Sequence, residues 1–400
     1  MSTTIFISAG EASGEHYGAL LVAALQKRLA ASGQSASFFG MGGPRMAAAG
    51  LQCVVRSEDM AVMGFTEIVL HLPRIWREYR KLKQAIRQRL PSVAVLIDFP
   101  EIHFRLAEEF HRLGVPVIFF VSPQLWAWKK HRIKLVRKYV DKMLVIFPFE
   151  EPFYREQGVQ AEFVGHPLAE LPLPSINRED FAVANNLDAA KTWIGLLPGS
   201  RPKEIRDHLP TILQAAQNLH GEFQFLIPLA STLNAAQRSE VRQIANLHGT
   251  SLAVRLIDDL GAKGAIGPTA GGARAALYHA RASIVASGTA TVEAALIGNP
   301  FVVVYHVSAL TYAIAKRVVK VPFVAMANLI AGKQVVPELI QADFTADNIV
   351  QHITPLIADG QPRQSMINEL AQIRGLLRHG QRDSEAIDRV AEITLETIRL

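Results

Sequence analysis

The stretch IFISAGEASGEHYGALL, residues 5–21, starts as an apolar strand, turns through glycines and continues as a helical pattern. A strand that leads through a glycine-rich turn into a helix often forms a phosphate cradle, because free backbone N–H groups at the helix N-terminus attract anions. Two carboxylates, Glu11 and Glu15, lie in this turn and would repel a phosphate. The stretch therefore predicts the first βα unit of an α/β domain, with a loop that need not hold a phosphate.

Short β-rich runs alternate with longer helical patterns along the rest of the chain, as in βαβ units with a parallel sheet. In the first half these runs are TIFIS near residue 4, ASFFG near 36, VAVLI near 93, VPVIFFV near 115, KMLVIF near 142 and AEFVG near 161. The rhythm restarts with WIGLLPG, FQFLIPL, SLAVRLI, ASIVASG and FVVVY. The second half therefore also reads as a doubly wound domain.

Local changes in composition along the chain predict where one domain ends and the next begins. The segment PLAELPLPSIN, residues 167–177, carries three prolines, which disfavour helix and remove backbone donors from a sheet, so we interpret it as the linker. We expect domains at residues 1–170 and 178–345, followed by helices at 346–400 that pack back on the first domain. The Gly- and Ala-rich residues 258–277 suggest a mobile loop.

The overall composition indicates a packed globular protein, with 49% hydrophobic and 20% charged residues in 400. Cys53 is the only cysteine, so no intrachain disulfide can form. The Met-Ser-Thr-Thr start lacks the basic residues of a signal peptide, and no run approaches the roughly 20 apolar residues that span a bilayer. We expect a cytoplasmic protein. Its net charge of +6 favours an anionic partner: nucleic acid, a membrane surface or a phosphorylated ligand.

Two segments of the second half are suited to a nucleotide diphosphate. In LLPGSRPKEI, residues 196–205, a strand ends at Gly199, Ser200 and Arg201, where a guanidinium can meet phosphate oxygens. In ASGTATVEAAL, residues 286–296, Ser287, Gly288 and Thr289 turn into a helix that carries Glu293, which can accept hydrogen bonds from sugar hydroxyls. Each segment also has an interpretation without a ligand. The first could be a solvated basic turn, and the second a capping threonine with a surface glutamate.

Other classes of site find little support in the sequence. No G-x-G-x-x-G follows the first strand, which disfavours a nicotinamide enzyme. There is no Asp-x-Asp pair, cysteine cluster or H-E-x-x-H, so we expect no metal and no cofactor. A helix N-terminus and Arg201 would then neutralise a diphosphate leaving group.

A carboxylate in VAVLIDFPEIHFRLA is the candidate catalytic group. Asp98 comes directly after an apolar strand, where the crevice outside the carboxyl ends of a parallel sheet is expected. There it could take the proton from an attacking hydroxyl. An aspartate that caps the turn beside Pro100 is an equally good interpretation from position alone.

Basic charge gathers in EIVLHLPRIWREYRKLKQAIRQRL, residues 67–90, where apolar residues recur at helical spacing. Such a helix could lie on anionic lipid or be a solvated helix face. Two further apolar-basic segments, residues 125–142 and 312–323, favour the membrane surface. The residues that we expect to face the membrane are Ile68, Leu72, Trp76, Arg77, Arg80 and Lys81.

Together these segments resemble the lipid-A-disaccharide synthase family, inverting glycosyltransferases of the GT-B fold. The motifs that carry the resemblance run from residue 5 to about 341: SAGEASGE, GMGGPRM, AVMGFTEI, LIDFPEIHFRL, VSPQLWAW, YVDKMLVIFPFEEPFY, FVGHPL, LLPGSRPKEI, ASGTATVEAAL and LIAGKQVVPELIQ. The resemblance implies two Rossmann-like domains facing a central cleft, the second of which binds the UDP-sugar. It further implies transfer of 2,3-diacylglucosamine from UDP to 2,3-diacylglucosamine 1-phosphate (lipid X) on the cytoplasmic face of the inner membrane. A homodimer through the C-terminal helices is also implied.

Residue roles carry over by motif. Asp98 resembles the essential carboxylate and is the candidate general base, Arg201 the phosphate-contacting arginine, residues 287–289 the diphosphate loop, Glu293 the ribose-binding acid, and Asn328 a polar position near the donor. Glu11, Ser13 and Glu15 would contact sugar hydroxyls or position catalytic groups.

The sequence departs from the family pattern in three places. Glu15 replaces the usual aspartate, the Gly-rich stretch at 258–277 is longer, and HARAS replaces a Ser-Asp pair. Two rival functions remain. One is a GT-B enzyme acting on another UDP-amino sugar, such as a 2-epimerase or a cell-wall glycosyltransferase. The other is a basic nucleic-acid-binding protein, whose binding would fall steeply with salt and ignore UDP.

Overall fold

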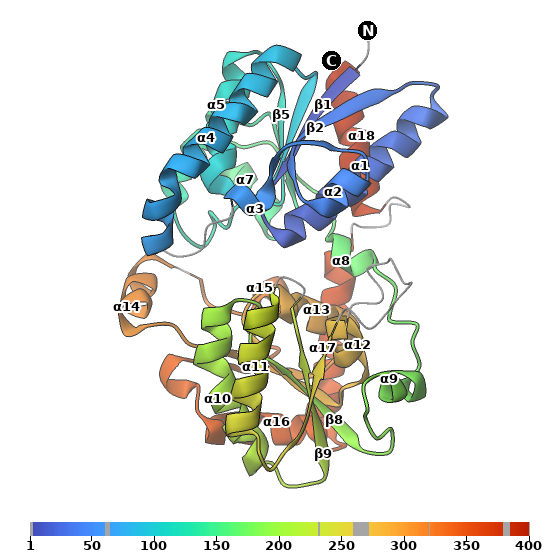
Figure 1. The fold of residues 1–400 in the computed structure, drawn as a ribbon, viewed down its shortest axis with the longest axis vertical. Coiled ribbons are helices and arrows are strands. Elements are labelled where there is room, and N and C mark those ends of the chain that lie inside the picture. Colours follow the sequence, from blue (N-terminus) through green and yellow to red (C-terminus); the bar gives the residue numbers. More distant parts are fainter. Residues whose placement is uncertain are drawn as a thin grey trace. The chain divides into compact units, whose positions relative to one another are not determined.

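A computed structural model of the chain describes residues 3–60, 65–230, 233–258, 272–319, 321–378 and 385–399. The chain divides into two compact units, each built around one parallel sheet (Figure 1). Unit 1 comprises Met1–Glu170 and Leu377–Leu400, and unit 2 comprises Leu171–Leu376. This architecture confirms the expected pair of doubly wound Rossmann-like domains.

The sheet of unit 1 has seven strands in the order β3-β2-β1-β4-β5-β6-β7. The chain works outward from β1 in one direction and from β4 in the other, so the topological switch point lies between β1 and β4. The strands are β1 (Thr3–Ala9), β2 (Ala36–Gly42), β3 (Gln52–Arg56), β4 (Val93–Ile97), β5 (Val117–Phe120), β6 (Lys142–Val145) and β7 (Ala161–Phe163).

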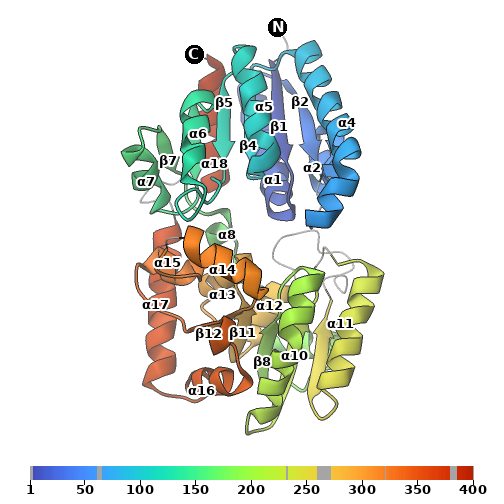
Figure 2. The ribbon, with the colours of Figure 1, turned by 90° about the vertical axis from the view of Figure 1, so that its left-hand side faces the viewer.

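Helices cover both faces of this sheet, which is why its central strands are continuous apolar runs (Figures 1 and 2). Ile5, Phe6 and Ile7 are all fully buried. α4, α5 and α6 pack on one face, while α1 and α18 pack on the other. The helices are α1 (Ala12–Ala31), α2 (Pro44–Ala48), α3 (Ser57–Met60), α4 (Phe65–Arg89), α5 (Pro100–Arg112), α6 (Ile133–Tyr139), α7 (Glu150–Glu156), α8 (Pro167–Glu170) and α18 (Ala386–Arg399).

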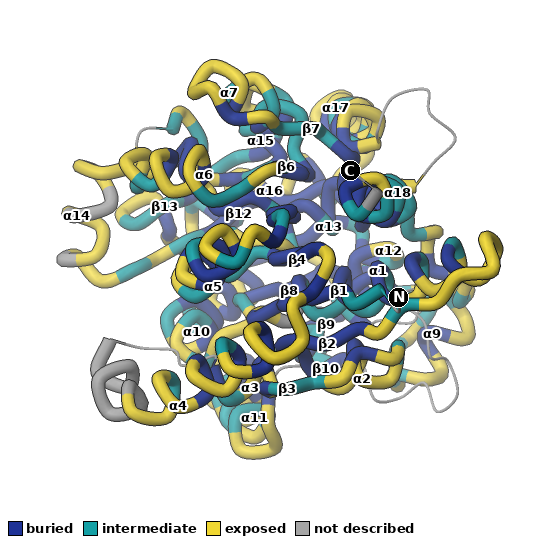
Figure 3. The backbone as a smooth tube through the Cα atoms, turned by 90° about the horizontal axis from the view of Figure 1, so that it is seen from above, coloured by how far each residue is buried: buried dark blue, intermediate teal, exposed yellow. Residues whose placement is uncertain are grey.

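The sheet of unit 2 has six strands in the order β10-β9-β8-β11-β12-β13, and its switch point lies between β8 and β11. Its inner strands β8, β9, β11 and β12 are largely buried, whereas the edge strands β10 and β13 are mostly of intermediate burial (Figure 3). The strands are β8 (Thr192–Leu197), β9 (Phe223–Pro228), β10 (Ala253–Ile257), β11 (Ala282–Ala286), β12 (Phe301–Tyr305) and β13 (Glu338–Ile340). The helices are α9 (Arg178–Ala184), α10 (Pro202–Asn218), α11 (Ala235–His248), α12 (Gly272–His279), α13 (Thr289–Ile297), α14 (Ala309–Val318), α15 (Met326–Ala331), α16 (Ala346–Ile357) and α17 (Gln361–Leu377).

Three expectations about connections need correction. The predicted linker begins with a short helix, α8, that belongs to unit 1; the border between the units follows Glu170, where the first domain was expected to end. Of the C-terminal helices, α18 belongs to unit 1 and packs on α1, whereas α16 buries its apolar stripe against β11 and β12 of unit 2. Of the predicted loop at 258–277, residues 259–271 lie outside the described residues, and the remainder opens α12, whose Ala275 and Ala276 are buried.

Candidate active site

Unit 1 brings two of the predicted loops together at its switch point. Ala9 pairs with Ile97, so the loop after β1 and the loop after β4 leave the sheet side by side. Glu11 follows in the first loop and Asp98 opens the second. The negative charge of Glu11 acts on the Asp98 carboxyl, so the two predicted carboxylates are neighbours.

Asp98 has an unusual backbone conformation. Its φ is +51° and that of Phe99 is +53°, so two consecutive non-glycine residues occupy the left-handed region. Each such residue costs about 1–2 kcal/mol relative to a right-handed one. The Asp98 N–H donates to the Phe120 carbonyl at 2.9 Å, which ties the turn to β5. The surrounding structure therefore holds the turn in a backbone conformation that its residues do not favour.

The Asp98 carboxyl is partly buried, and this environment changes its acidity. Burial, followed by the charge of Glu11, raises the pKa of Asp98 from 3.8 to about 7, against the lowering effect of a hydrogen bond from the Phe99 N–H. A carboxylate with this pKa takes up a proton more readily than an ordinary aspartate. The environment of Asp98 therefore suits a general base that works near neutral pH.

Gly10 is required where the two loops meet. A Cβ atom placed on Gly10 would lie 2.3 Å from the ring of Phe99. We expect Gly10→Ala to destabilise the protein by about 1–3 kcal/mol, because the ring cannot move without displacing the Asp98 turn. Thermal unfolding measures the effect. The matched control is Gly375→Ala in α17, where a Cβ meets open space and alanine should stabilise by about 0.5–1 kcal/mol. Equal stabilities for the two variants would contradict the packing argument.

An ion-pair cluster links the Asp98 turn to the segment after β5. Glu101, at the start of α5, accepts two hydrogen bonds from Arg132 at 3.0 and 2.7 Å and one from Lys129 at 3.1 Å. The hydrogen bond from Arg132 is the largest of the effects that lower the pKa of Glu101. A bidentate arginine pair of this kind fixes orientation as well as charge.

A second buried carboxylate, Glu150, orders the same edge of the sheet and was not predicted as a site residue. Glu150 is 1% exposed and accepts from the Ser122 hydroxyl at 2.7 Å, the Trp126 indole N–H at 3.1 Å and the Phe147 N–H at 3.1 Å. Burial raises the pKa of Glu150 to about 7 despite these donors. Glu150 thus joins the loop after β5 to the loop after β6. Its motif, FPFEEPFY, was among the recognised segments and was the available signal.

The other predicted residues of the first loop have different surroundings. Glu11 is exposed and Ser13 is half-buried near the start of α1. Glu15 accepts a hydrogen bond from the Arg45 N–H at 2.7 Å, at the start of α2. This contact anchors α1 to α2, so we propose that Glu15 stabilises the loop rather than taking part in the reaction.

Unit 2 also joins its predicted loops at a switch point. Leu197 pairs with Val285, so the segment 199–201 and the segment 287–289 leave the sheet side by side. Gly288 has φ +151° and ψ −162°, a conformation essentially restricted to glycine, and it caps α13 without any side chain. The N-terminus of α13 is therefore a helix end of the kind that suits an anion.

Arg201 stands at the start of α10 with a side chain that is 53% exposed. Its guanidinium lies 3.4 Å from Glu204, a loose pair in a solvated setting. The other Glu204 oxygen accepts from the N–H groups of Ser200 and Arg201, and Gly199, with φ +123°, leaves room for that carboxylate. Arg201 therefore keeps donors for a ligand.

Asn328 differs from the expectation that it contacts the donor. Its side chain is fully buried, and its oxygen accepts from the N–H groups of Val335 and Val336. Its nitrogen donates to the Val336 carbonyl and to Glu338. The side-chain amide of Asn328 thus makes four hydrogen bonds within the protein, and these bonds brace the segment 335–338.

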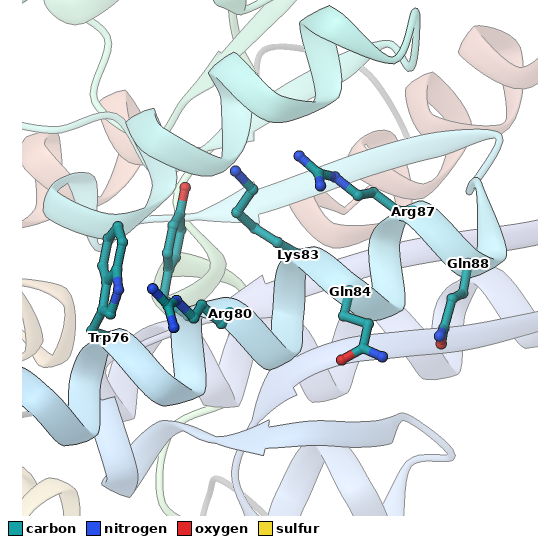
Figure 4. Close-up of a pocket in the computed structure, with 7 residues that line it drawn as sticks. Trp76, Arg80, Lys83, Gln84, Arg87 and Gln88 are labelled. Atoms are coloured by element: carbon teal, nitrogen blue, oxygen red, sulfur yellow. The ribbon is translucent and has the colours of Figure 1, made fainter.

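The expected membrane-facing helix, α4, divides into two faces. Tyr79, Leu82 and Ile86 belong to the core, so the apolar side of this half of α4 packs on the sheet. On the other face Trp76 is 47% exposed, and Figure 4 shows Trp76 and Arg80 projecting from successive turns. A surface hollow of about 390 Å³ is lined by Trp76, Tyr79, Arg80, Lys83, Gln84, Arg87 and Gln88. Arg77 and Lys81 are exposed, while the side chains of Ile68 and Leu72 lie outside the described residues.

Within the described part of the chain, no three His, Cys, Asp or Glu side chains lie close enough to hold a metal ion. None of the helices there is both long enough and apolar enough to cross a membrane.

Comparison with known proteins identifies the family. A family model described as lipid-A-disaccharide synthetase matches residues 5–391. The chain is 57% identical over 395 residues to the lipid-A-disaccharide synthase of Acidobacterium capsulatum, covering 99% of this chain and 96% of that protein. The chain belongs to the lipid-A-disaccharide synthase family. A second member of the lipid-A-disaccharide synthase family, from Koribacter versatilis, is 48% identical, covering 98% of this chain and 97% of the relative. Enzymes of this family are glycosyltransferases, so this chain is a glycosyltransferase.

Solved structures share the fold at low identity. A UDP-GlcNAc 2-epimerase from Neisseria meningitidis bound to UDP-GlcNAc superposes with a TM-score of 0.61 at 13% identity, covering 100% of both chains. MurG from Acinetobacter baumannii superposes with a TM-score of 0.55 at 14% identity, covering 99% of this chain and 100% of that one. These matches confirm the GT-B fold. The rival functions are not favoured, because the relatives with high sequence identity to this chain belong to the lipid-A-disaccharide synthase family.

Proposed function

We propose that this enzyme joins UDP-2,3-diacylglucosamine to 2,3-diacylglucosamine 1-phosphate (lipid X), forming the β-1,6-linked disaccharide 1-phosphate and UDP. Family membership supports the reaction class. The observation that carries the proposal is Asp98, a partly buried carboxylate at a switch point with a pKa raised to about 7. Such a group is suited to deprotonating a sugar hydroxyl.

In the proposed mechanism Asp98 accepts the proton of the acceptor's 6-hydroxyl as its oxygen attacks the anomeric carbon. Attack on the face opposite UDP breaks the bond to the β-phosphate oxygen and inverts the anomeric centre through an oxocarbenium-like state. The negative charge that grows on the departing diphosphate is stabilised by Arg201 and the N-terminus of α13. Glu293, half-buried on α13, accepts hydrogen bonds from the ribose hydroxyls. The roles divide between the units: unit 1 supplies the base, and unit 2 the donor-binding groups.

The direct test supplies both acylated sugars to the purified protein. Formation of disaccharide 1-phosphate and UDP in equal amounts is the expected result. UDP-2,3-diacylglucosamine consumed at an equal rate without acceptor would indicate a hydrolase, and conversion of UDP-GlcNAc to a second UDP-amino sugar would indicate an epimerase. Either outcome would contradict the proposal.

The pH dependence of the reaction follows from Asp98. The base must be ionised, and because its pKa is raised to about 7, the active form should decline about tenfold for each pH unit below 7. We expect kcat/KM to rise with pH up to about 7 and then to level off. A steady-state pH profile measures this, with UDP affinity followed in parallel. An acid limb centred near pH 4 would show that Asp98 has an ordinary acidity, or is not the base.

We also propose that the protein is a peripheral enzyme of the cytoplasmic face of the inner membrane, where its acylated substrates reside. The exposed face of α4, with Trp76, Arg77, Arg80 and Lys81, supports this location, since each cation near an anionic surface contributes about 1 kcal/mol. We expect Trp76→Ser with Arg80→Ala to weaken binding to phosphatidylglycerol vesicles by about tenfold or more. The control is Arg112→Ala on α5, which removes an exposed cation from another helix. Unchanged binding by the double variant, or equal binding to neutral vesicles, would contradict the assignment.

A further inference from the structure

A buried serine and histidine form a hydrogen-bonded pair, and the histidine also contacts the backbone of Asp98. Ser8 lies in β1 and His103 in α5, and both are fully buried. The Ser8 hydroxyl lies 2.8 Å from Nε2 of His103. Nδ1 of His103 makes a short hydrogen bond with the main-chain carbonyl of Asp98. Hydrogen bonds thus run from β1 through His103 to Asp98, the residue that we propose as the base.

The chemistry of the partners fixes the direction of these bonds. A carbonyl oxygen only accepts, so Nδ1 of His103 carries the ring proton and donates it. Burial lowers the pKa of His103 to about 4, so the ring is neutral at pH 7 and Nε2 is an acceptor. The Ser8 hydroxyl therefore donates to Nε2. Both ring nitrogens are satisfied in one tautomer.

Aromatic packing holds the imidazole in place. The ring of His103 makes edge contacts with Phe99, with centroids 5.8 Å apart, and with Phe119, with centroids 6.1 Å apart. Phe99 in turn packs against Gly10 of the first loop. The imidazole cannot rotate without displacing the turn that contains Asp98.

We infer that Ser8 and His103 are positioning residues for catalysis, which hold Asp98 in its left-handed conformation and keep its carboxyl sheltered beside Glu11. This inference rests on the proposed role of Asp98. A rarely populated backbone conformation persists only where the surrounding structure holds it in place. The hydrogen bond from His103 acts directly on the backbone of Asp98. The charge of Glu11, which immediately precedes α1, acts on the Asp98 carboxyl, while His103 from α5 contacts the main-chain carbonyl of the same residue. Glu101, in the first turn of α5, forms ion pairs with Arg132 and Lys129.

The test compares Ser8→Ala and His103→Asn with wild type in the acylated-sugar assay across pH. We expect His103→Asn to lower kcat about 10- to 100-fold, with the KM for the donor within about twofold, because a misplaced base affects the chemical step. The released carboxyl becomes hydrated, so the acid limb of kcat/KM should move to lower pH by about half a unit or more. Ser8→Ala should shift both quantities in the same direction by less. His111→Asn makes the same substitution at an exposed position of α5 and should match wild type.

The position of the acid limb decides the outcome. If it stays at the wild-type pH in both variants, the inference is wrong and the pair serves folding alone, whatever happens to kcat. If His103→Asn does not fold, Ser8→Ala, which removes a single oxygen atom, decides by the same shift. Asp98→Asn distinguishes failure of the proposed function from failure of this inference. Wild-type turnover in Asp98→Asn overturns the proposed function. If Asp98→Asn loses turnover but Ser8→Ala and His103→Asn leave the acid limb unmoved, only this inference is overturned.

Discussion

Asp98→Asn is expected to lower turnover by about 10³-fold or more, because an amide cannot accept the proton of the attacking hydroxyl and general base catalysis contributes about 10²- to 10⁴-fold. The side chain keeps its size, so the loops at the carboxyl edge of the first sheet should keep their packing. UDP affinity should be unchanged, because the proposed donor-binding groups belong to unit 2. Single-turnover formation of the disaccharide and calorimetric titration with UDP measure the two quantities separately.

The control for this experiment is Asp347→Asn, the same substitution at an exposed position of α16. It should retain full turnover. Loss of UDP affinity in Asp98→Asn would place the residue at the donor, and turnover within tenfold of wild type would exclude it as the base.

Arg201→Ala is expected to weaken UDP binding by about 10- to 100-fold, since a hydrogen bond between charged groups contributes about 1.5–3 kcal/mol. The guanidinium is half exposed and only loosely paired with Glu204, so little internal structure depends on it. The helix start is formed by the backbone of Arg201, which alanine retains. Calorimetric titration with UDP avoids the acyl chains and reports on the diphosphate contact directly.

A matched variant on the same helix distinguishes this contact from the general charge of the surface. Arg206→Ala removes an equally exposed arginine of α10, which pairs with Glu240. Its UDP affinity should remain within about twofold of wild type after correction for ionic strength. Equal losses in the two variants would mean that Arg201 acts through the electrostatic field of the domain rather than by contact with phosphate.

Most of the fold could be predicted from the sequence, because central parallel strands are buried on both faces and stand out as apolar runs. Two edge strands were missed. β3 has exposed Gln52 and Arg56 at its ends, and β13 has only three residues, so neither forms a clear apolar run. Edge strands pair on one side only and need less hydrophobic sequence.

Prediction of the site was less complete. Asp98 and the segment 287–289 stay predictions; they were proposed because they follow strands, and strand ends at a switch point mark the crevice of such sheets. The contacts of Glu15 and Asn328 with the backbone could not be predicted, because they depend on residues that only folding brings close. Ser8 and His103 are 95 positions apart in the sequence, and no local spacing links them.

The return of the last helix to unit 1 has a consequence for protein synthesis. α18 buries Val390 and Ala391 in unit 1, so the part of the chain that leaves the ribosome first lacks a piece of its core until residues 386–399 have been made. At about 5–20 residues per second, that piece follows residue 170 by roughly 10–45 seconds. Unit 2 is contiguous and can complete its core during this interval. The order in which the two units can complete their cores is therefore the reverse of the order of translation.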